Sequence, residues 1–142
     1  MAVAQHPIIG SWSLVRWQIR HADGHTSYPF GSEAHGRLLY SATGQMLACI
    51  AAAQRPSLST AVPKNATDPE KAAAFDGYFS YGGPFEIDGD DVLHYVEMSL
   101  NPNFVGSVQR RHMAFTGNRL TLSASEPSGS GSRNHELIWE AL

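Results

Sequence analysis

The stretch from Leu93 to Phe115 constrains the fold of this chain more than any other part of the sequence. It reads LHYVEMSLNPNFVGSVQRRHMAF. This predicts two long strands joined by a turn at the Asn-Pro-Asn, because these residues favour turns and interrupt strands. A hairpin folded just after Asn103 places Glu97 across from Arg110 or Arg111. Opposite charges at facing positions attract, so we expect an ion pair there.

Short apolar runs separated by turn signals predict further strands. Beyond the hairpin, the predicted strands are residues 12–21, 36–41, 45–52, 85–87, 119–123 and 135–141. With the hairpin they make about eight, and closing such a sheet into a barrel removes its exposed edges. The sequence therefore predicts an all-β fold, an eight-stranded antiparallel up-and-down barrel with one short α-helix. It forms a single domain over residues 1–142.

The first predicted strand carries a tryptophan on each face. Regular alternation places Trp12 and Leu14 on one face, and Val15 and Trp17 on the other. We therefore expect both faces of this strand to meet packed surface.

One helix is expected, from about Asp68 to Tyr81. Thr67 and Glu70 match a capping box at its start, and a Gly-Gly-Pro follows its predicted end. Its apolar residues at helical spacing are Ala72, Phe75, Tyr78 and Phe79. The apolar residues of 53–66 follow neither a helical nor a strand period, so this segment is predicted to be a surface loop. The SGSGS at residues 128–132 predicts a flexible linker between strands.

The composition excludes several classes of function. Lysine and arginine total 10 against 13 acidic residues, a formal net charge of −3, so the chain lacks the basic excess of a nucleic-acid-binding protein. The sequence contains no phosphate-binding loop, nucleophile elbow or dinucleotide motif. The spacing of histidine, cysteine and carboxylate residues predicts no metal site. We therefore expect no cofactor, no metal and no nucleic-acid partner.

Cysteine usage and hydropathy predict the location of the protein. Cys49 is the one cysteine, so no internal disulfide can form, as is common in a reducing compartment. Its apolar surroundings favour a buried, inert thiol over a nucleophile. The N-terminus shows no signal-peptide pattern, and no run of about 20 apolar residues occurs. We expect a cytoplasmic protein that does not insert into a membrane.

Segments spread along nearly the whole chain resemble the bacterial and fungal lipocalin-like domain family. They are GSWSLV (10–15), TSYPFG (26–31), GRLLYSATGQM (36–46), AAFDGYFSYGGPFEID (73–88), HYVEMSLNPNFVG (94–106) and QRRHMAFTGNRLTLS (109–123). The resemblance implies a calycin-type β-barrel. It does not imply one activity, because calycin barrels serve binding and, in some natural-product pathways, isomerisation or cyclisation. Leu137 stands where fatty-acid-binding proteins typically carry a carboxylate-binding arginine, which argues against simple fatty-acid carriage.

Five residues are predicted to line a ligand site. They are Glu97, Arg111, His94, Tyr78 and Trp17. A charge inside a barrel is costly unless it is paired. Glu97 with Arg111 is therefore either a structural ion pair or a polar anchor in which Arg111 holds a ligand carbonyl or carboxylate. His94 and Glu97 are the candidates for a catalytic base.

Three functions remain open from the sequence. The first is binding of a small, largely apolar molecule, hydrophobic or amphipathic, inside the barrel. The second is a cofactor-independent isomerase or cyclase acting on a secondary-metabolite intermediate, with His94 or Glu97 moving a proton. The third is a structural or interaction module with a filled core. The side chains that would fill it are Trp12, Trp17, Met98, Met113 and Phe115.

Overall fold

The computed structural model describes residues 3–129 and 131–142. Its strands are β1 (Gly10–Arg20), β2 (Thr26–Ser27), β3 (His35–Tyr40), β4 (Gln45–Ala51), β5 (Tyr78–Asp88), β6 (Asp91–Tyr95), β7 (Met98–Ser99), β8 (Val108–Thr116), β9 (Arg119–Ser128) and β10 (Gly131–Ala141). The helix α1 spans Asp68–Asp76, and short 3-10 turns cover Val3–Gln5, Pro63–Asn65 and Pro102–Phe104.

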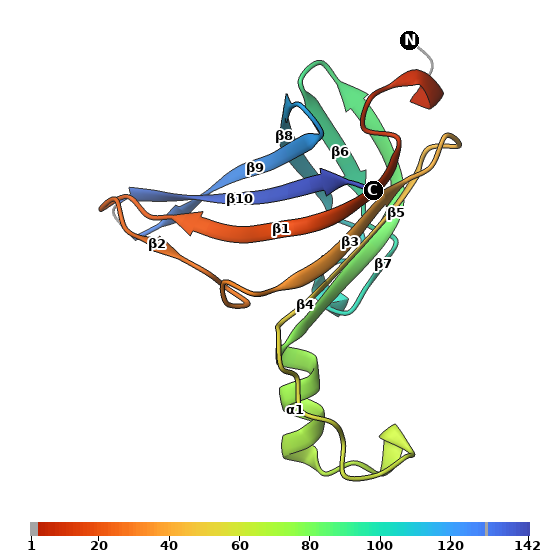
Figure 1. The fold of residues 1–142 in the computed structure, drawn as a ribbon, viewed down its shortest axis with the longest axis vertical. Coiled ribbons are helices and arrows are strands. Elements are labelled where there is room, and N and C mark those ends of the chain that lie inside the picture. The colour runs from red at the N-terminus through yellow and green to blue at the C-terminus, as the bar shows by residue number, and fades with distance from the viewer. Residues whose placement is uncertain (1–2, 130) are drawn as a thin grey trace.

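Eight of these strands close into an antiparallel barrel (Figure 1). The order runs β1, β3, β4, β5, β6, β8, β9, β10, and β10 pairs back with β1. The two-residue strands β2 and β7 attach beside β1 and β5. The predicted eight-stranded up-and-down barrel is confirmed.

A bulge in β1 explains why the first strand carries tryptophan on both faces. Leu14 pairs with Trp139 and Arg16 pairs with Ile138, so Val15 is an extra residue in the ladder. An extra residue exchanges the two faces of a strand. Trp12 is therefore buried in the core, while Trp17, beyond the bulge, also faces the barrel interior.

The N-terminal segment covers one end of the barrel. Ile8 is fully buried in the core cluster, and its carbonyl oxygen accepts a hydrogen bond from Trp12 Nε1 at 2.9 Å. Figure 1 shows this segment and α1 at opposite ends of the barrel. The closed end therefore holds the packed core, and the interior nearer α1 is left for a cavity.

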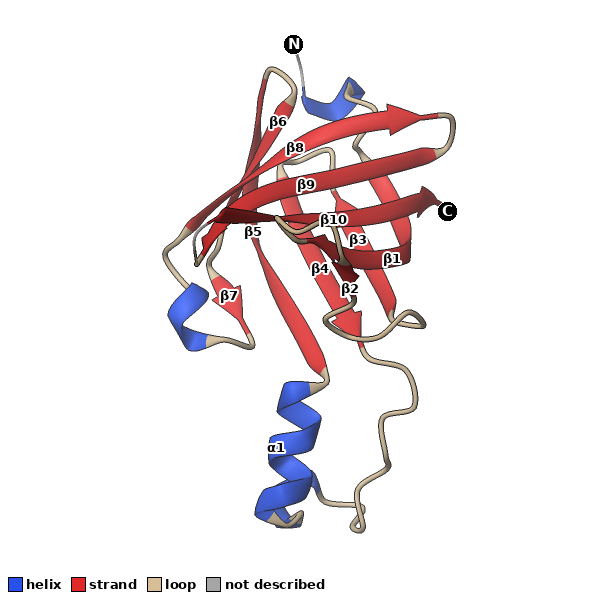
Figure 2. Cartoon of the chain, turned by 90° about the vertical axis from the view of Figure 1, so that its left-hand side faces the viewer, coloured by secondary structure: helices blue, strands red, loops and turns tan. Residues whose placement is uncertain are grey.

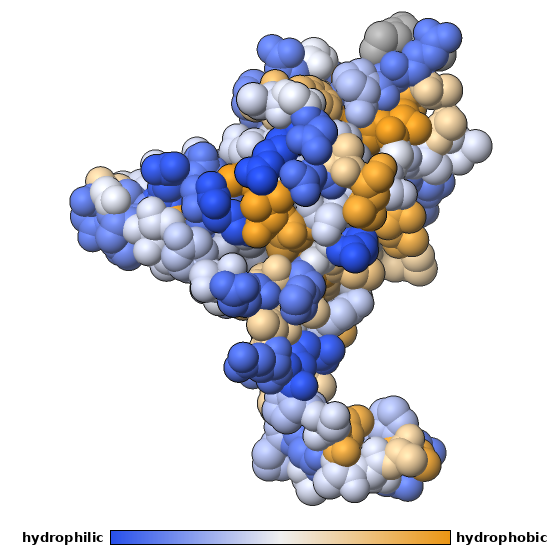
Figure 3. Space-filling view, in the orientation of Figure 1, coloured by the Kyte–Doolittle hydropathy of each residue, from blue (hydrophilic) through white to orange (hydrophobic). Residues whose placement is uncertain are grey.

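The helix is shorter than predicted, and it stands off the barrel. The capping box of Thr67 and Glu70 is confirmed, but Gly77 ends α1 after Asp76. Tyr78 then starts β5, which pairs with β4 over seven residues. This pairing satisfies the backbone more fully than a further helical turn after glycine would. None of the residues of α1 is buried, and the helix forms a lobe outside the barrel (Figures 2 and 3).

The predicted ion pair of Glu97 is wrong, because the central hairpin has a different register. His94 pairs with Gln109, and the 12-residue connection 96–107 carries β7 and a 3-10 turn. The backbone N–H of Glu97 donates to the Gly82 carbonyl oxygen at 2.9 Å, and its side chain is exposed. A Cβ on Gly83 would lie 2.0 Å from the Tyr95 carbonyl oxygen. Glycine is therefore required where the connection crosses β5.

The loop prediction for residues 53–66 is largely confirmed, since this segment holds only the short turn Pro63–Asn65. The predicted linker at 128–132 is wrong where the structure describes it. Ser128, at the end of β9, pairs with Gly131, at the start of β10. The part of that prediction on Ser130 lies outside the described residues. In the described part of the chain, no helix is long and apolar enough to cross a membrane.

Candidate functional site

The barrel encloses a cavity of about 690 Å³. Phe75, Asp76 and Tyr78 line it, so it reaches the end of the barrel where α1 joins β5. Ligand pockets typically measure ~300–1,000 Å³, so this cavity suits a small organic molecule. The alternative of a filled core does not fit this cavity. Met98 is 64% exposed and Phe115 is 39% exposed, so neither occupies the interior.

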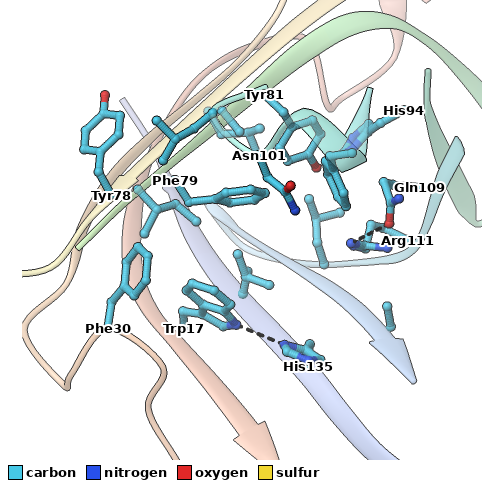
Figure 4. Close-up of a pocket in the computed structure, with 18 of the residues that line it drawn as sticks. Trp17, Phe30, Tyr78, Phe79, Tyr81, His94, Asn101, Gln109, Arg111 and His135 are labelled. Atoms are coloured by element: carbon cyan, nitrogen blue, oxygen red, sulfur yellow. Dashed lines mark hydrogen bonds between the residues drawn. The ribbon is translucent and has the colours of Figure 1, made fainter. Parts of the chain in front are cut away.

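Aromatic side chains form much of the cavity wall (Figure 4). Phe79 and Tyr81 of β5 contact Phe104 edge to face, with ring centroids 5.5 and 5.2 Å apart. Across the cavity, Trp17 and Phe30 make a similar contact at 5.1 Å. Rigid rings of this kind offer flat apolar faces against which another ring can pack.

His94 holds two tyrosines at the inner part of the cavity. It is 1% exposed, its Nε2 lies 2.6 Å from the Tyr40 hydroxyl, and its Nδ1 lies 2.7 Å from the Tyr81 hydroxyl. Burial, together with the Arg111 charge, lowers the pKa of His94 to about 3. Burial also raises the pKa of Tyr81 to about 12 and that of Tyr40 well above its usual range. All three side chains are therefore neutral near pH 7.

Arg111 of β8 brings a positive charge to the same cavity. Its guanidinium donates to the Arg110 carbonyl oxygen at 2.9 Å and to Gln109 Oε1 at 3.3 Å. Both acceptors are neutral. The neighbouring Arg110 faces outward and pairs with Asp91 at 2.7 Å and Asp88 at 2.9 Å. Within the described residues, no carboxylate lies at ion-pair distance from Arg111.

A second polar cluster lies beside Trp17. The Trp17 indole N–H donates to His135 Nδ1 at 3.2 Å, which leaves the ring proton on Nε2. Nε2 donates to Glu126 Oε1 at 2.9 Å, and Arg133 also contacts this carboxylate. The hydrogen bond from His135, then that from Arg133, lowers the pKa of Glu126. The charges and hydrogen-bond donors of this cluster are therefore paired with one another.

Trp139 contributes a donor of a different kind. Its side chain is 1% exposed and lines the cavity, yet its indole Nε1 has no hydrogen-bond partner. In the described residues it is the one buried side-chain nitrogen or oxygen left unpaired. Such a group is costly to bury unless something satisfies it.

Four of the five predicted site residues line the cavity, namely Trp17, Tyr78, His94 and Arg111. Glu97 does not, because the connection after β6 carries it to the outside. Tyr78 sits at the rim with its hydroxyl pointing away from the interior (Figure 4). The neighbouring Cys49 raises the pKa of Tyr78. Cys49 itself is half-buried rather than buried, which corrects the sequence prediction.

Five further residues line the cavity that were not among the predicted site residues, namely Tyr81, Gln109, His135, Glu126 and Trp139. Strand alternation was the available signal: once Arg111 is placed inward, Gln109 two residues earlier faces inward as well. Tyr81 was missed because it was assigned to the helix. The described residues contain no group of three or more histidine, cysteine or acidic side chains placed to hold a metal ion.

Known proteins resemble this chain to different degrees. Residues 9–142 match the model of the lipocalin-like domain family. The chain is 36% identical over 87 residues to the 4'-hydroxy-3'-methoxypropiophenone carrier protein ppsC of Aspergillus oryzae, covering 54% of this chain and 78% of that protein. A crystal structure of an uncharacterized protein from Bacteroides eggerthii aligns over 93% of this chain and 98% of its own, with a TM-score of 0.46 and 11% identity. The protein belongs to the lipocalin-like domain family.

Proposed function

We propose that this protein binds and carries a small, largely apolar molecule with an aromatic ring and oxygen substituents. The observation that carries the proposal is the 690 Å³ barrel cavity, lined by aromatic rings and a few fixed polar groups. Apolar walls supply affinity, while fixed polar groups set the orientation of a ligand.

The relative from Aspergillus oryzae supports this class of ligand. Its name describes a carrier of 4'-hydroxy-3'-methoxypropiophenone, an aromatic ketone with a phenol. A molecule of that kind offers a flat ring to the faces of Phe79, Phe104 and Trp17. Its oxygen atoms can accept hydrogen bonds from Tyr81 and Arg111.

The isomerase or cyclase alternative has less support. A general base works best with a pKa near the working pH, whereas that of His94 is lowered to about 3. Both ring nitrogens of His94 are already hydrogen-bonded to tyrosines, and Glu97 lies outside the cavity. Carriage without chemical change therefore fits the cavity better. A cytoplasmic location stays a prediction.

Calorimetric titration with propiophenone and its 4'-hydroxy-3'-methoxy derivative tests the proposal. The variant Ala124→Trp places an indole in the cavity, whereas Ala114→Trp makes the same change at an exposed position on the neighbouring strand. Saturable binding is expected for the wild type and for Ala114→Trp, and loss of binding for Ala124→Trp. Ala48→Trp, also in the lining, repeats the test if Ala124→Trp does not fold.

Native mass spectrometry of the purified protein gives an independent readout. A bound small molecule that leaves on denaturation would supply the ligand class directly. Failure of every aromatic ketone to bind, together with the mass of the bare chain, would contradict the proposed function. Equal binding by Ala124→Trp would place the ligand outside the barrel.

A further inference from the structure

The hydrogen bonds around His94 determine which group is free to contact a ligand. Tyr40 is 2% exposed, and the described residues offer its hydroxyl one hydrogen-bond partner, His94 Nε2 at 2.6 Å. A buried hydroxyl needs an acceptor for its proton. Tyr40 therefore donates to Nε2, which must be the unprotonated nitrogen of the neutral ring.

The proton of the His94 ring then lies on Nδ1. From there it donates to the Tyr81 hydroxyl oxygen at 2.7 Å. Tyr81 accepts this bond, so its own O–H remains available. Tyr81 lines the cavity. The hydrogen bonds from Tyr40 to His94 and from His94 to Tyr81 therefore leave the Tyr81 O–H available to a molecule bound in the cavity.

Two further donors belong to side chains that line the same cavity. Trp139 Nε1–H is buried and unpaired. Among the described residues, the hydrogen bonds of Arg111 go to the neutral oxygens of Arg110 and Gln109. Its partner Gln109 pairs with His94 between β6 and β8, and Arg111, Gln109, Tyr81 and His94 all line the same cavity. The inner cavity thus combines a positive charge with the free Tyr81 donor, and no carboxylate of the described residues lies at ion-pair distance from Arg111.

We propose that the inner cavity binds an ionised oxygen of the ligand, held by Arg111 with the Tyr81 hydroxyl as a further donor. The ligand is therefore an aromatic compound with an acidic hydroxyl or a carboxyl group, bound as its oxyanion. This inference rests on the proposed function, because it assigns the polar end of the same site. Opposite charges attract strongly where water is excluded, and hydrogen bonds to charged groups exceed neutral ones.

Three probes of similar size test the proposal by calorimetry. They are 4'-hydroxypropiophenone, its 4'-fluoro analogue, which cannot ionise, and 4-propionylbenzoate, which is ionised throughout. The wild type is expected to bind the hydroxy compound or the benzoate about 10- to 100-fold more tightly than the fluoro compound. The preferred anion identifies the source of the oxygen as phenolate or carboxylate.

Variants assign the preference to this end of the cavity. Arg111→Met is expected to abolish the preference for an ionisable probe, and Arg111→Lys to restore part of it. The control Arg110→Met, at the outward arginine beside it, is expected to keep the preference. Tyr81→Phe, which removes only the phenolic donor, should reduce the preference about two- to tenfold.

The absorption spectrum reports the ionisation state directly, because a phenolate absorbs at longer wavelength than its phenol. Bound 4'-hydroxypropiophenone should show the phenolate band at a pH where the free probe is mostly neutral. Equal binding of the fluoro analogue and both ionisable probes would overturn this inference and leave the proposed function standing. A neutral phenol spectrum with no preference for the benzoate would overturn it too. Absence of binding by all three probes would contradict the proposed function itself.

Discussion

Two polar clusters face one cavity, and they differ in how completely their charges and hydrogen-bonding groups are paired within the cluster. The outer cluster of Trp17, His135 and Glu126 passes each proton to a defined acceptor, and Arg133 balances its carboxylate. The inner cluster around His94 is more deeply buried, yet its guanidinium has no carboxylate partner among the described residues, and we infer that the Tyr81 proton is free. A cluster whose charges and donors are all paired fixes the position of strands. A cluster with unpaired charges or donors is suited to recognising a ligand.

Removing the histidine from each cluster should separate these roles most clearly. His94→Phe leaves the buried hydroxyls of Tyr40 and Tyr81 without their partner, so we expect a loss of about 2–5 kcal/mol in the free energy of unfolding. His135→Phe affects groups nearer solvent and should cost below about 1 kcal/mol. Urea unfolding followed by circular dichroism measures both.

Equal losses for these two variants would remove the distinction between inner and outer clusters. The triple variant Tyr40→Phe, His94→Phe, Tyr81→Phe provides a control. Replacing all partners by apolar groups should recover part of the stability lost in His94→Phe, because no buried polar group is then left unpaired.

The burial of His94 also predicts how stability depends on pH. The pKa of His94 is lowered to about 3 in the folded state, against about 6.5 in an unfolded chain. Between these values the unfolded chain binds more protons, so stability falls as pH falls. From pH 6 to 5, above the titration of ordinary carboxyl groups, the slope should be about 1 kcal/mol per pH unit.

His94→Phe should remove most of this slope when unfolding is measured at pH 6.0, 5.5 and 5.0. Burial also lowers the pKa of His6, so a smaller slope of the same sign should remain. An unchanged slope in His94→Phe would show that the histidine is not held neutral by its surroundings.

The barrel was predictable from sequence because its signals are local. Alternation, glycine-containing turns and the spaced family segments each lie within a short stretch of chain. The closed sheet follows because unpaired strand edges are unfavourable. The helix start at Thr67 was predictable for the same reason, since a capping box spans only a few residues.

The site was less predictable because its contacts join distant residues. His94 meets Tyr40 54 positions away, and Trp17 meets His135 118 positions away. The Glu97 prediction failed through register, which depends on the 12-residue connection and on the close approach at Gly83. Neither the bulge at Val15 nor the inward side of β8 could be fixed until the barrel had closed. An error of one residue in register exchanges the two faces of a strand.

The smallest effect is expected for a substitution in the outer cluster. Glu126→Gln keeps the size of the side chain but removes the charge that meets His135 and Arg133. Because the carboxylate is 42% exposed, solvent screens these ion pairs, and the loss of stability should stay below about 1 kcal/mol. Affinity for 4'-hydroxypropiophenone should change less than about twofold, whereas Arg111→Met should abolish the preference for an ionised probe. If Glu126→Gln weakened binding as much as Arg111→Met, the outer cluster would take part in recognition. The division between a structural and a ligand-binding cluster would then have to be abandoned.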